Sequence, residues 1–155
     1  MKTRTILTGL AGFVVGAAAC FAADLNMGTW KLNEAKSKLG AAGGAKNTTV
    51  VYEAAGDMVK ITVDGVDAAG KPVHHEWTGK FDGNDYPVTG DPTSDTRSYK
   101  VVSDRVLTFN AKKGGKVVTT GRVVVAADGK SRAVNATTTD SSGKKANAVS
   151  VYDKQ

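Results

Sequence analysis

The sequence has little of several residue types that would indicate a particular chemistry. It contains one cysteine, two histidines and three prolines among 155 residues. A single cysteine cannot form an intramolecular disulfide, so the core alone must hold the domain together. No Gly-x-Ser-x-Gly sequence occurs, and the lysine in the glycine-rich stretch 40–48 follows alanine instead of glycine. These absences exclude a serine-hydrolase elbow and a phosphate-binding loop of the usual type.

Long apolar runs are also scarce, and the only one lies near the N-terminus. Residues 6–19 are apolar apart from Thr8 and three glycines, and Lys2 and Arg4 precede them. A basic start, a short apolar run and small residues at the exit are typical of a secretory signal peptide. The run is shorter than the roughly 20 residues that a membrane-spanning helix needs. We therefore expect residues 1–22 to be a signal peptide that is cleaved after Ala22, and the mature protein to be periplasmic or secreted.

Cys20 leaves a second possibility for the mature N-terminus. Residues 17–20 read Ala-Ala-Ala-Cys, which loosely resembles a bacterial lipobox. Lipidation of Cys20 would attach the protein to a membrane, whereas cleavage after Ala22 would remove the only cysteine. Both outcomes stay open at this point, and we expect membrane association only if Cys20 is lipidated.

The composition after the signal favours β-structure. Residues 23–155 contain 18 valines and 14 threonines but only four leucines and one isoleucine. Branching at Cβ favours the extended backbone over the helix. The formal net charge of the whole chain is +6, but the basic residues do not cluster with aromatic ones, so we expect no nucleic-acid partner.

Apolar and polar residues alternate through most of the chain, as in strands with two unlike faces. Glycine-containing turn signals, such as Asp-Gly at 128–129 and Gly-Gly at 114–115, separate these segments. We expect the stretch 34–46 to form a short helical turn or a mobile loop, and the stretch 84–95, which holds two prolines, to form a long loop. The predicted strands are 28–33, 47–55, 58–67, 71–81, 96–103, 105–112, 116–127, 130–139 and 145–153.

These strands predict a single all-β domain over residues 23–155. Because no helical segment is long enough for a parallel crossover, the sheet should be an antiparallel up-and-down meander of eight or nine strands. Closure into a β-barrel would remove the exposed edges of such a meander. A two-sheet β-sandwich is the alternative. We expect a monomer.

The first predicted strand reads Gly28-Thr29-Trp30-Lys31-Leu32-Asn33. A Gly-x-Trp sequence on the first strand of a small antiparallel barrel resembles the calycin superfamily, which includes lipocalins, avidins and fatty-acid-binding proteins. Together with Asp-Gly-Asn-Asp-Tyr-Pro-Val-Thr-Gly at 82–90, the chain is similar to exported bacterial lipocalin-like proteins. The resemblance implies a barrel whose closed end is formed by Gly28 and Trp30, with a basic residue stacked on the tryptophan. Arg122 and Arg132 are the candidates for that residue.

Clusters of chemically versatile residues are few. His74, His75 and Glu76 suggest a metal site, but neighbours on a strand point to opposite faces, so the two histidines cannot readily chelate one ion. The four aspartates between 82 and 95 do not have EF-hand spacing and are typical of turns. We therefore expect no metal, no cofactor and no catalytic residues, and hence no enzyme.

The function that remains is the binding of a small apolar or amphipathic ligand inside the barrel. Such a site needs an apolar lining with a few polar anchors. The residues proposed to line it, with His75 and Tyr52 as polar anchors, are Tyr52, Ile61, Val63, Val73, His75, Trp77 and Phe81. The alternative is a non-catalytic protein of the cell envelope whose barrel is filled by its own side chains.

Overall fold

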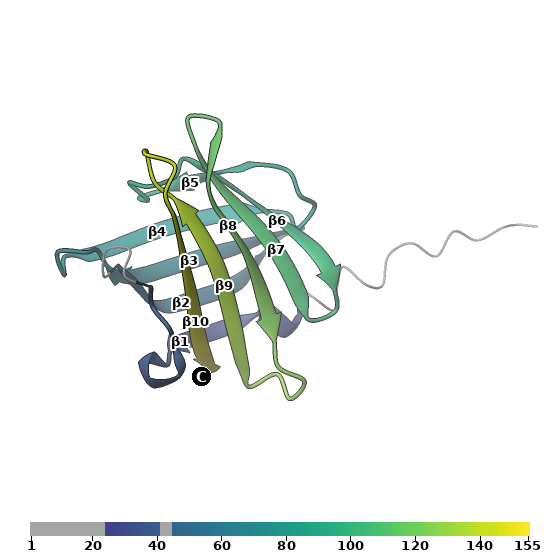
Figure 1. Ribbon diagram of the computed structural model, residues 1–155. Helices are drawn as coiled ribbons and strands as arrows, with labels where there is room; N and C mark the ends of the chain where they lie inside the picture. Colours follow the sequence, from purple (N-terminus) through teal and green to yellow (C-terminus); the bar gives the residue numbers. More distant parts are fainter. Residues whose placement is uncertain (1–23, 41–44) are drawn as a thin grey trace, which may run out of the picture.

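The computed structural model describes residues 24–40 and 45–155, so the predicted signal peptide and Cys20 lie outside the described residues. Within these ranges the chain forms one closed, antiparallel β-barrel in which each strand pairs with its neighbour in sequence and β1 pairs with β10 (Figure 1). No helix in the described part of the chain has the length and apolarity to span a membrane. The strands are β1 (Gly28–Leu32), β2 (Lys46–Ala55), β3 (Met58–Val66), β4 (Pro72–Gly79), β5 (Tyr86–Thr89), β6 (Thr96–Ser103), β7 (Val106–Lys113), β8 (Lys116–Val125), β9 (Ser131–Thr139) and β10 (Lys145–Lys154).

The alternation in the sequence becomes the inside and outside of the barrel. In β3, Val59, Ile61 and Val63 are buried, whereas the lysine, threonine and aspartate between and after them face outward. Because the period of a strand is two, this pattern fixes which face points to the core. The barrel expected from the meander is confirmed, and the sandwich alternative is wrong.

The strand count is ten, not eight or nine, because the predicted loop 84–95 contains β5. This strand pairs through only two residues with β4 and two with β6. Pro87 contributes no backbone N–H to a ladder, and four residues are too few to show a clear alternation. The short strand nevertheless fills the gap between β4 and β6 and so completes the barrel.

The stretch after β1 contains the predicted helical turn. A 3-10 helix, η1 (Glu34–Lys36), follows Asn33, whose side chain accepts a hydrogen bond from the Lys36 backbone N–H. Residues 41–44 of this stretch lie outside the described residues.

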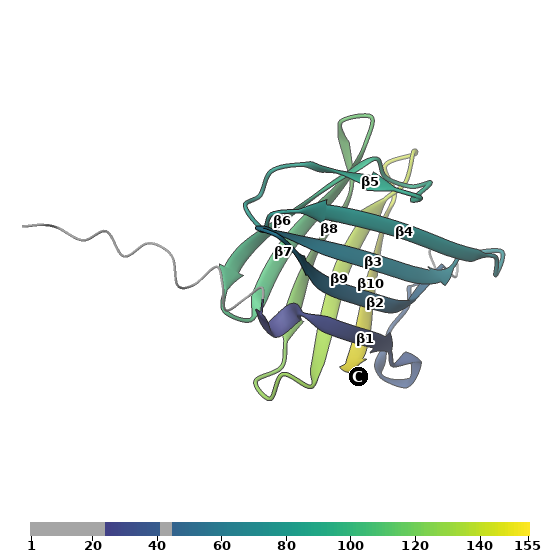
Figure 2. The same ribbon diagram turned by 180° about the vertical axis from the view of Figure 1, so that it is seen from behind.

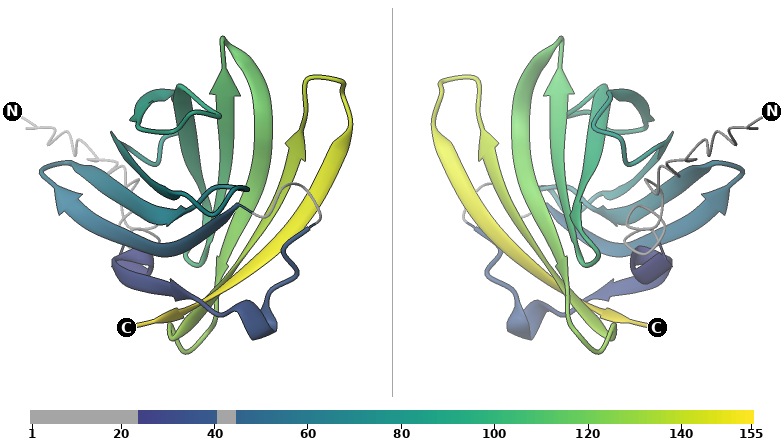
Figure 3. Two further views of the ribbon diagram at one scale, coloured as in Figure 1. Left: turned by 90° about the vertical axis from the view of Figure 1, so that its left-hand side faces the viewer. Right: turned by 90° about the vertical axis from the view of Figure 1, so that its right-hand side faces the viewer.

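Two groups of strands cross in the barrel. Figures 1 and 2 show β2, β3 and β4 running at a steep angle to β7–β10. Figure 3 shows the β7–β8 hairpin (green) and the β9–β10 hairpin (yellow) standing apart at one end, opposite the end where β1 and the C-terminus lie. We call the end near β1 the closed end and the end with the two hairpins the open end.

The inward-facing side chains of β7–β10 become smaller from the closed end to the open end. Residues that lie opposite one another on these four strands form rows across the barrel wall. The row nearest the closed end consists of Leu107, Val123, Val134 and Ser150, and the middle row of Phe109, Gly121, Ala136 and Ala148. The row nearest the open end consists of Ala111, Thr119, Thr138 and Ala146. Gly121 is required in the middle row because a Cβ there would overlap the ring of Phe109. The closed end is therefore packed, whereas the small residues leave space towards the open end.

Candidate ligand-binding site

The space inside the barrel is a cavity of about 720 Å³. Small-molecule sites typically measure about 300–1,000 Å³, so this cavity is large enough for a ligand. Its walls come from β2–β4 on one side and from β6–β10 on the other, and residues 91–93 also contribute. The cavity exists because Ala111, Ala146 and Ala148 line it where a filled barrel would have large side chains.

Five of the seven predicted ligand-binding residues line this cavity. Tyr52, Ile61, Val63, Val73 and His75 are part of its wall. Four of them are almost fully buried, and Val73 is half-buried. The predicted combination of an apolar wall with a tyrosine and a histidine is thus present at one place.

Trp77 and Phe81 lie outside the cavity wall, in an aromatic cluster. The Trp77 ring stacks on Phe81 with 6.2 Å between centroids and meets the edges of Tyr86 and Tyr99. Its indole N–H donates to the Arg97 carbonyl oxygen over 2.8 Å. Trp77 therefore packs the barrel next to β5 and β6 and connects them, which is a structural role.

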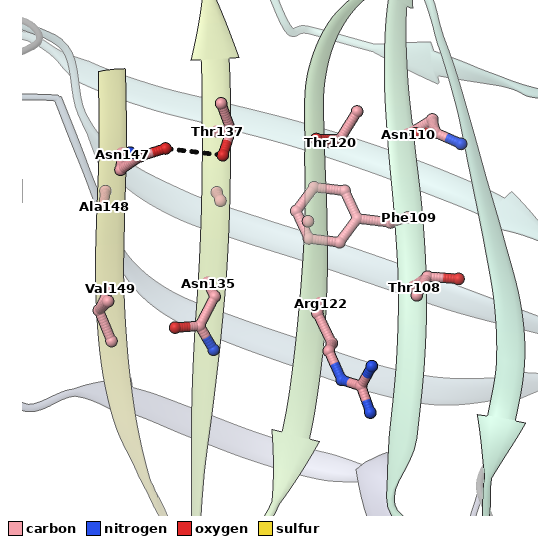
Figure 4. A pocket seen from close by; sticks show the side chains of 12 residues that line it. Thr108, Phe109, Asn110, Thr120, Arg122, Asn135, Thr137, Asn147, Ala148 and Val149 are labelled. Carbon is pink, nitrogen blue, oxygen red and sulfur yellow. Dashed lines mark hydrogen bonds between the residues drawn. The ribbon is translucent and has the colours of Figure 1, made fainter. Parts of the chain in front are cut away.

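At the closed end Trp30 packs against an arginine side chain. Trp30 is fully buried, and its indole N–H donates to the Asn26 carbonyl oxygen over 2.7 Å. The Arg132 guanidinium lies over the Trp30 ring, 4.6 Å from the centroid. Arg122 is exposed on the outside of the barrel (Figure 4). Of the two candidate arginines, Arg132 is therefore the stacked one. Gly28 has a φ of 103°, which explains glycine at this position.

Sequence reasoning missed a polar cluster at the cavity wall that involves His75, Arg97 and Asp91. The Asp91 carboxylate accepts hydrogen bonds from the Ser94 hydroxyl, from the Thr93 N–H (2.8 Å) and hydroxyl (2.6 Å), and from Arg97 Nη2 (3.1 Å). Both charged side chains are mostly buried, at 13% and 6% exposure for Arg97 and Asp91. The sequence does contain a signal for this cation: Arg97 is two residues before Tyr99 on a strand, so both side chains point to the same, inward face.

In this cluster the negative charge of Asp91 balances the positive charge of Arg97. Burial alone would raise the pKa of Asp91, but the hydrogen bonds from Ser94 and Thr93 and the charge of Arg97 outweigh it and lower the pKa. Burial, followed by the charge of Arg97, lowers the pKa of His75. His75 is therefore neutral at neutral pH, and its Nε2 atom has no hydrogen-bond partner within the described ranges. The cluster offers a neutral polar anchor towards the cavity.

The adjacent His74 lies outside the barrel. Its Nδ1 atom is 2.6 Å from Asp64 Oδ1, and its Nε2 atom is 3.7 Å from Glu76, which also pairs with Lys60. These contacts make an exposed ion-pair network. Among the described residues no group of three or more His, Cys, Asp or Glu side chains is placed to hold a metal ion.

A second hollow of about 470 Å³ lies on the outer surface of β7–β10. Figure 4 shows polar side chains along it, including Asn110, Arg122 and Asn135, and a hydrogen bond between Thr137 and Asn147. Its floor is the row that contains Gly121, where the Phe109 ring lies behind the strand. The polar side chains along it are exposed or half-exposed, so it lacks the enclosed apolar wall of the inner cavity.

Comparison with solved structures supports the barrel. A chain described as EF1p2_mFAP2b bound to DFHBI has a TM-score of 0.54 and 10% identity, over 88% of this chain and 99% of that chain. A redesigned β-barrel, mFAP1, bound to DFHBI has a TM-score of 0.49 and 14% identity, over 86% of this chain and 98% of that one. No protein-family model and no curated protein matches the chain. The first of these likenesses shows a shared antiparallel β-barrel fold.

Proposed function

We propose that the protein is an exported, non-catalytic binding module that holds a small apolar or amphipathic ligand inside its barrel. The observation that carries this proposal is the 720 Å³ cavity, because a barrel with a purely structural role has no need to leave its interior unfilled. The apolar wall and the polar anchors Tyr52 and His75 are what such a site requires. The barrel described as bound to DFHBI supports the proposal, because it shows that a small barrel of this fold accommodates a ligand.

The cavity also favours this function over the alternative of a filled barrel. A filled barrel would have large side chains in every inward row, whereas across β7–β10 the rows with Gly121 and Ala111 are mostly small. Small residues in a core lose packing energy. Their presence in two adjacent rows favours a ligand that occupies the space.

Mass spectrometry of the protein purified from its native cell envelope tests the proposal. Under non-denaturing conditions we expect an intact mass that exceeds the denatured mass by a few hundred daltons, because a cavity of this size holds one small molecule. The denatured mass also tests the predicted cleavage after Ala22 against lipidation of Cys20.

A pair of variants locates the ligand. Ala111→Phe places a ring in the cavity and should abolish the added mass, whereas Asn110→Phe, the exposed neighbour on β7, should retain it. Equal native and denatured masses, also after incubation with a lipid extract, would instead support the filled-barrel alternative. Loss of the added mass in Asn110→Phe alone would place the ligand in the outer hollow.

A further inference from the structure

The outer hollow of β7–β10 lies between two rows of outward-facing side chains (Figure 4). Each row has one residue from each of the four strands, because the register places these residues opposite one another. The row nearer the closed end consists of Thr108, Arg122, Asn135 and Val149, and the row nearer the open end consists of Asn110, Thr120, Thr137 and Asn147. Residues two apart on a strand are separated by roughly 7 Å, and four adjacent strands span about 14 Å. The outer hollow is therefore long enough, across the strands, for a short extended polymer.

The floor of the outer hollow has little relief. Between the two rows lie Gly121, which has no side chain, and Ala136 and Ala148, whose methyl groups point into the barrel. A ligand can therefore approach the backbone of the strands closely, as small residues allow. At the β10 end of one row, Val149 adds an apolar contact.

Three asparagines stand in the interior of strands at this place: Asn110 in β7, Asn135 in β9 and Asn147 in β10. Asparagine is depleted in strands. Within the described ranges, the hydrogen bond from Thr137 to Asn147 is the only one between side chains of the two rows. The amides of Asn110 and Asn135 therefore add nothing to the fold that accounts for them. Residues that depart from a local preference without a structural gain are expected at functional sites.

The charge of the outer hollow differs from that of the outer face of β3 and β4. There the outward side chains form ion pairs, with 2.8 Å between Lys60 and Glu76 and 2.6 Å between His74 and Asp64. The two rows of the outer hollow contain one charged residue, Arg122, which takes part in no ion pair of the described residues. The outer hollow thus suits a polar ligand without charge.

The class of ligand follows from the side chains that are present. A protein interface has an apolar core rich in aromatic residues, whereas the large exposed hydrophobic residues of the described ranges, Val102 and Val117, lie outside the outer hollow. A nucleic acid needs several cations to neutralise its phosphates, and Arg122 is one. A sugar hydroxyl donates and accepts hydrogen bonds, as the asparagine amide and the threonine hydroxyl do. Two rows of such groups therefore match a chain of sugar rings.

We propose that the outer hollow binds an extended, uncharged oligosaccharide that crosses β7–β10, with Asn110 and Asn135 bonding to hydroxyl groups on its two sides. A straight path across four strands favours β-1,4-linked chains, which are extended, over α-1,4-linked chains, which coil. The inference goes beyond the proposed function, because these side chains point away from the cavity and either site can act without the other.

An NMR titration with trisaccharides tests this inference. Cellotriose and tri-N-acetylchitotriose are added to isotope-labelled protein, and maltotriose, the α-linked isomer of cellotriose, is the comparison. We expect both β-linked sugars to shift the side-chain amide signals of Asn110, Asn135 and Asn147 with a Kd on the order of 1 mM, since each hydrogen bond at an exposed site contributes little. Maltotriose should bind roughly 10-fold more weakly, because a coiled chain reaches fewer of the groups.

Matched variants locate the sugar. Asn135→Ala and Thr120→Ala each remove a polar group from one row and should weaken the binding of cellotriose about 3–10-fold. Thr62→Ala removes the same hydroxyl group from the outer face of β3 and should leave the Kd unchanged. Because all three side chains face outward, the variants should keep the Tm of the unmodified protein, which verifies that they fold.

Two larger substitutions separate this inference from the proposed function. Asn110→Phe places a ring in the outer hollow and should abolish sugar binding, whereas Ala111→Phe fills the cavity and should leave sugar binding intact. Amide shifts confined to residues that face the cavity would overturn the position of the sugar. No shift with any trisaccharide, or equal affinity for cellotriose and maltotriose, would overturn the inference and leave the cavity proposal standing.

Discussion

The two histidines illustrate how a one-residue step along a strand changes the chemistry of a side chain. His74 and His75 are neighbours in β4, yet one is in an exposed ion-pair network and the other faces the cavity. The alternation of polar and apolar residues predicted these opposite faces correctly. It did not predict that Asp64 bonds to His74 or that the charge of Arg97 acts on His75, because Asp64 and Arg97 lie on other strands.

We predict that the pKa of His74 lies above the usual value for histidine and that the pKa of His75 lies below it. The hydrogen bond to Asp64 raises the pKa of His74, whereas burial and then Arg97 lower that of His75. Protonated His74 therefore favours folding at low pH, and this contribution disappears as the pH rises through its folded pKa. For His75 the sign is reversed, because the folded protein favours its neutral form. The contribution of His75 to folding stability is fully present above about pH 6.5, the pKa of an unfolded histidine, and is lost as the pH falls through its folded pKa.

An NMR titration of the imidazole signals checks this, since only two histidines are present. Asp64→Asn should lower the pKa of His74 and leave that of His75 almost unchanged. Two titrations that coincide near 6.5 would contradict the assignment of the faces.

Gly121 shows a second residue-level constraint, which is steric. A Cβ at this position would overlap the Phe109 ring and lie 2.7 Å from the Asn135 carbonyl oxygen. We predict that Gly121→Ala lowers the free energy of unfolding by about 1–3 kcal/mol, the usual range for overpacking. Chemical denaturation measures this change in the free energy of unfolding. Phe109→Leu in the same chain should recover part of the loss, and full stability of the single variant would show that the ring moves freely.

Among the elements, β5 has the shortest ladders, with two paired residues on each side. The Asp91 hydrogen bonds therefore add to the attachment of β5 and of the segment that follows it. A carboxylate inside a proline- and aspartate-rich stretch is typical of a turn, and only the approach of Arg97 from β6 distinguishes this one. That approach depends on the pairing of β5 with β6, which local sequence does not reveal.

We predict that Asp91→Asn loosens this segment. It removes the charge that Arg97 faces and should cost about 1–3 kcal/mol, as for a buried group that loses its partner. Hydrogen exchange of the β5 amides should accelerate before that of β3. Asp85→Asn is the matched control, because Asp85 pairs with Lys112 at the surface and exposed pairs contribute about 0–1 kcal/mol.

Acid should have the same effect as the substitution. The pKa of Asp91 is lower in the folded protein than its usual value, so its contribution is present above about pH 4 and decreases as the pH falls through the folded pKa. Hydrogen exchange in β5 that rises equally in Asp91→Asn and the unmodified protein across this range would show that another carboxyl holds the segment.

For the whole molecule, the fold was more predictable than the site. Nine strands follow from alternation and turn residues, and closure follows from the need to cover edges. The cavity depends instead on which small residues fall into one row, as Gly121, Ala136 and Ala148 do, and that requires the register of three strands. The choice between Arg122 and Arg132 was open for a related reason: valines occupy both faces of β8, so the pattern there does not identify the inner one.

The cavity also couples ligand binding to the stability of the entire barrel, because its wall includes residues from both groups of strands. We predict that a saturating amphipathic ligand, at 100 times its Kd, stabilises the folded state by about 2.7 kcal/mol. For a domain of this size that corresponds to an increase in Tm on the order of 10 °C, which differential scanning calorimetry measures. Ala111→Phe should show no increase and Asn110→Phe the full one. An equal increase in both variants would mean that the ligand acts at the outer surface, since only the first variant alters the interior.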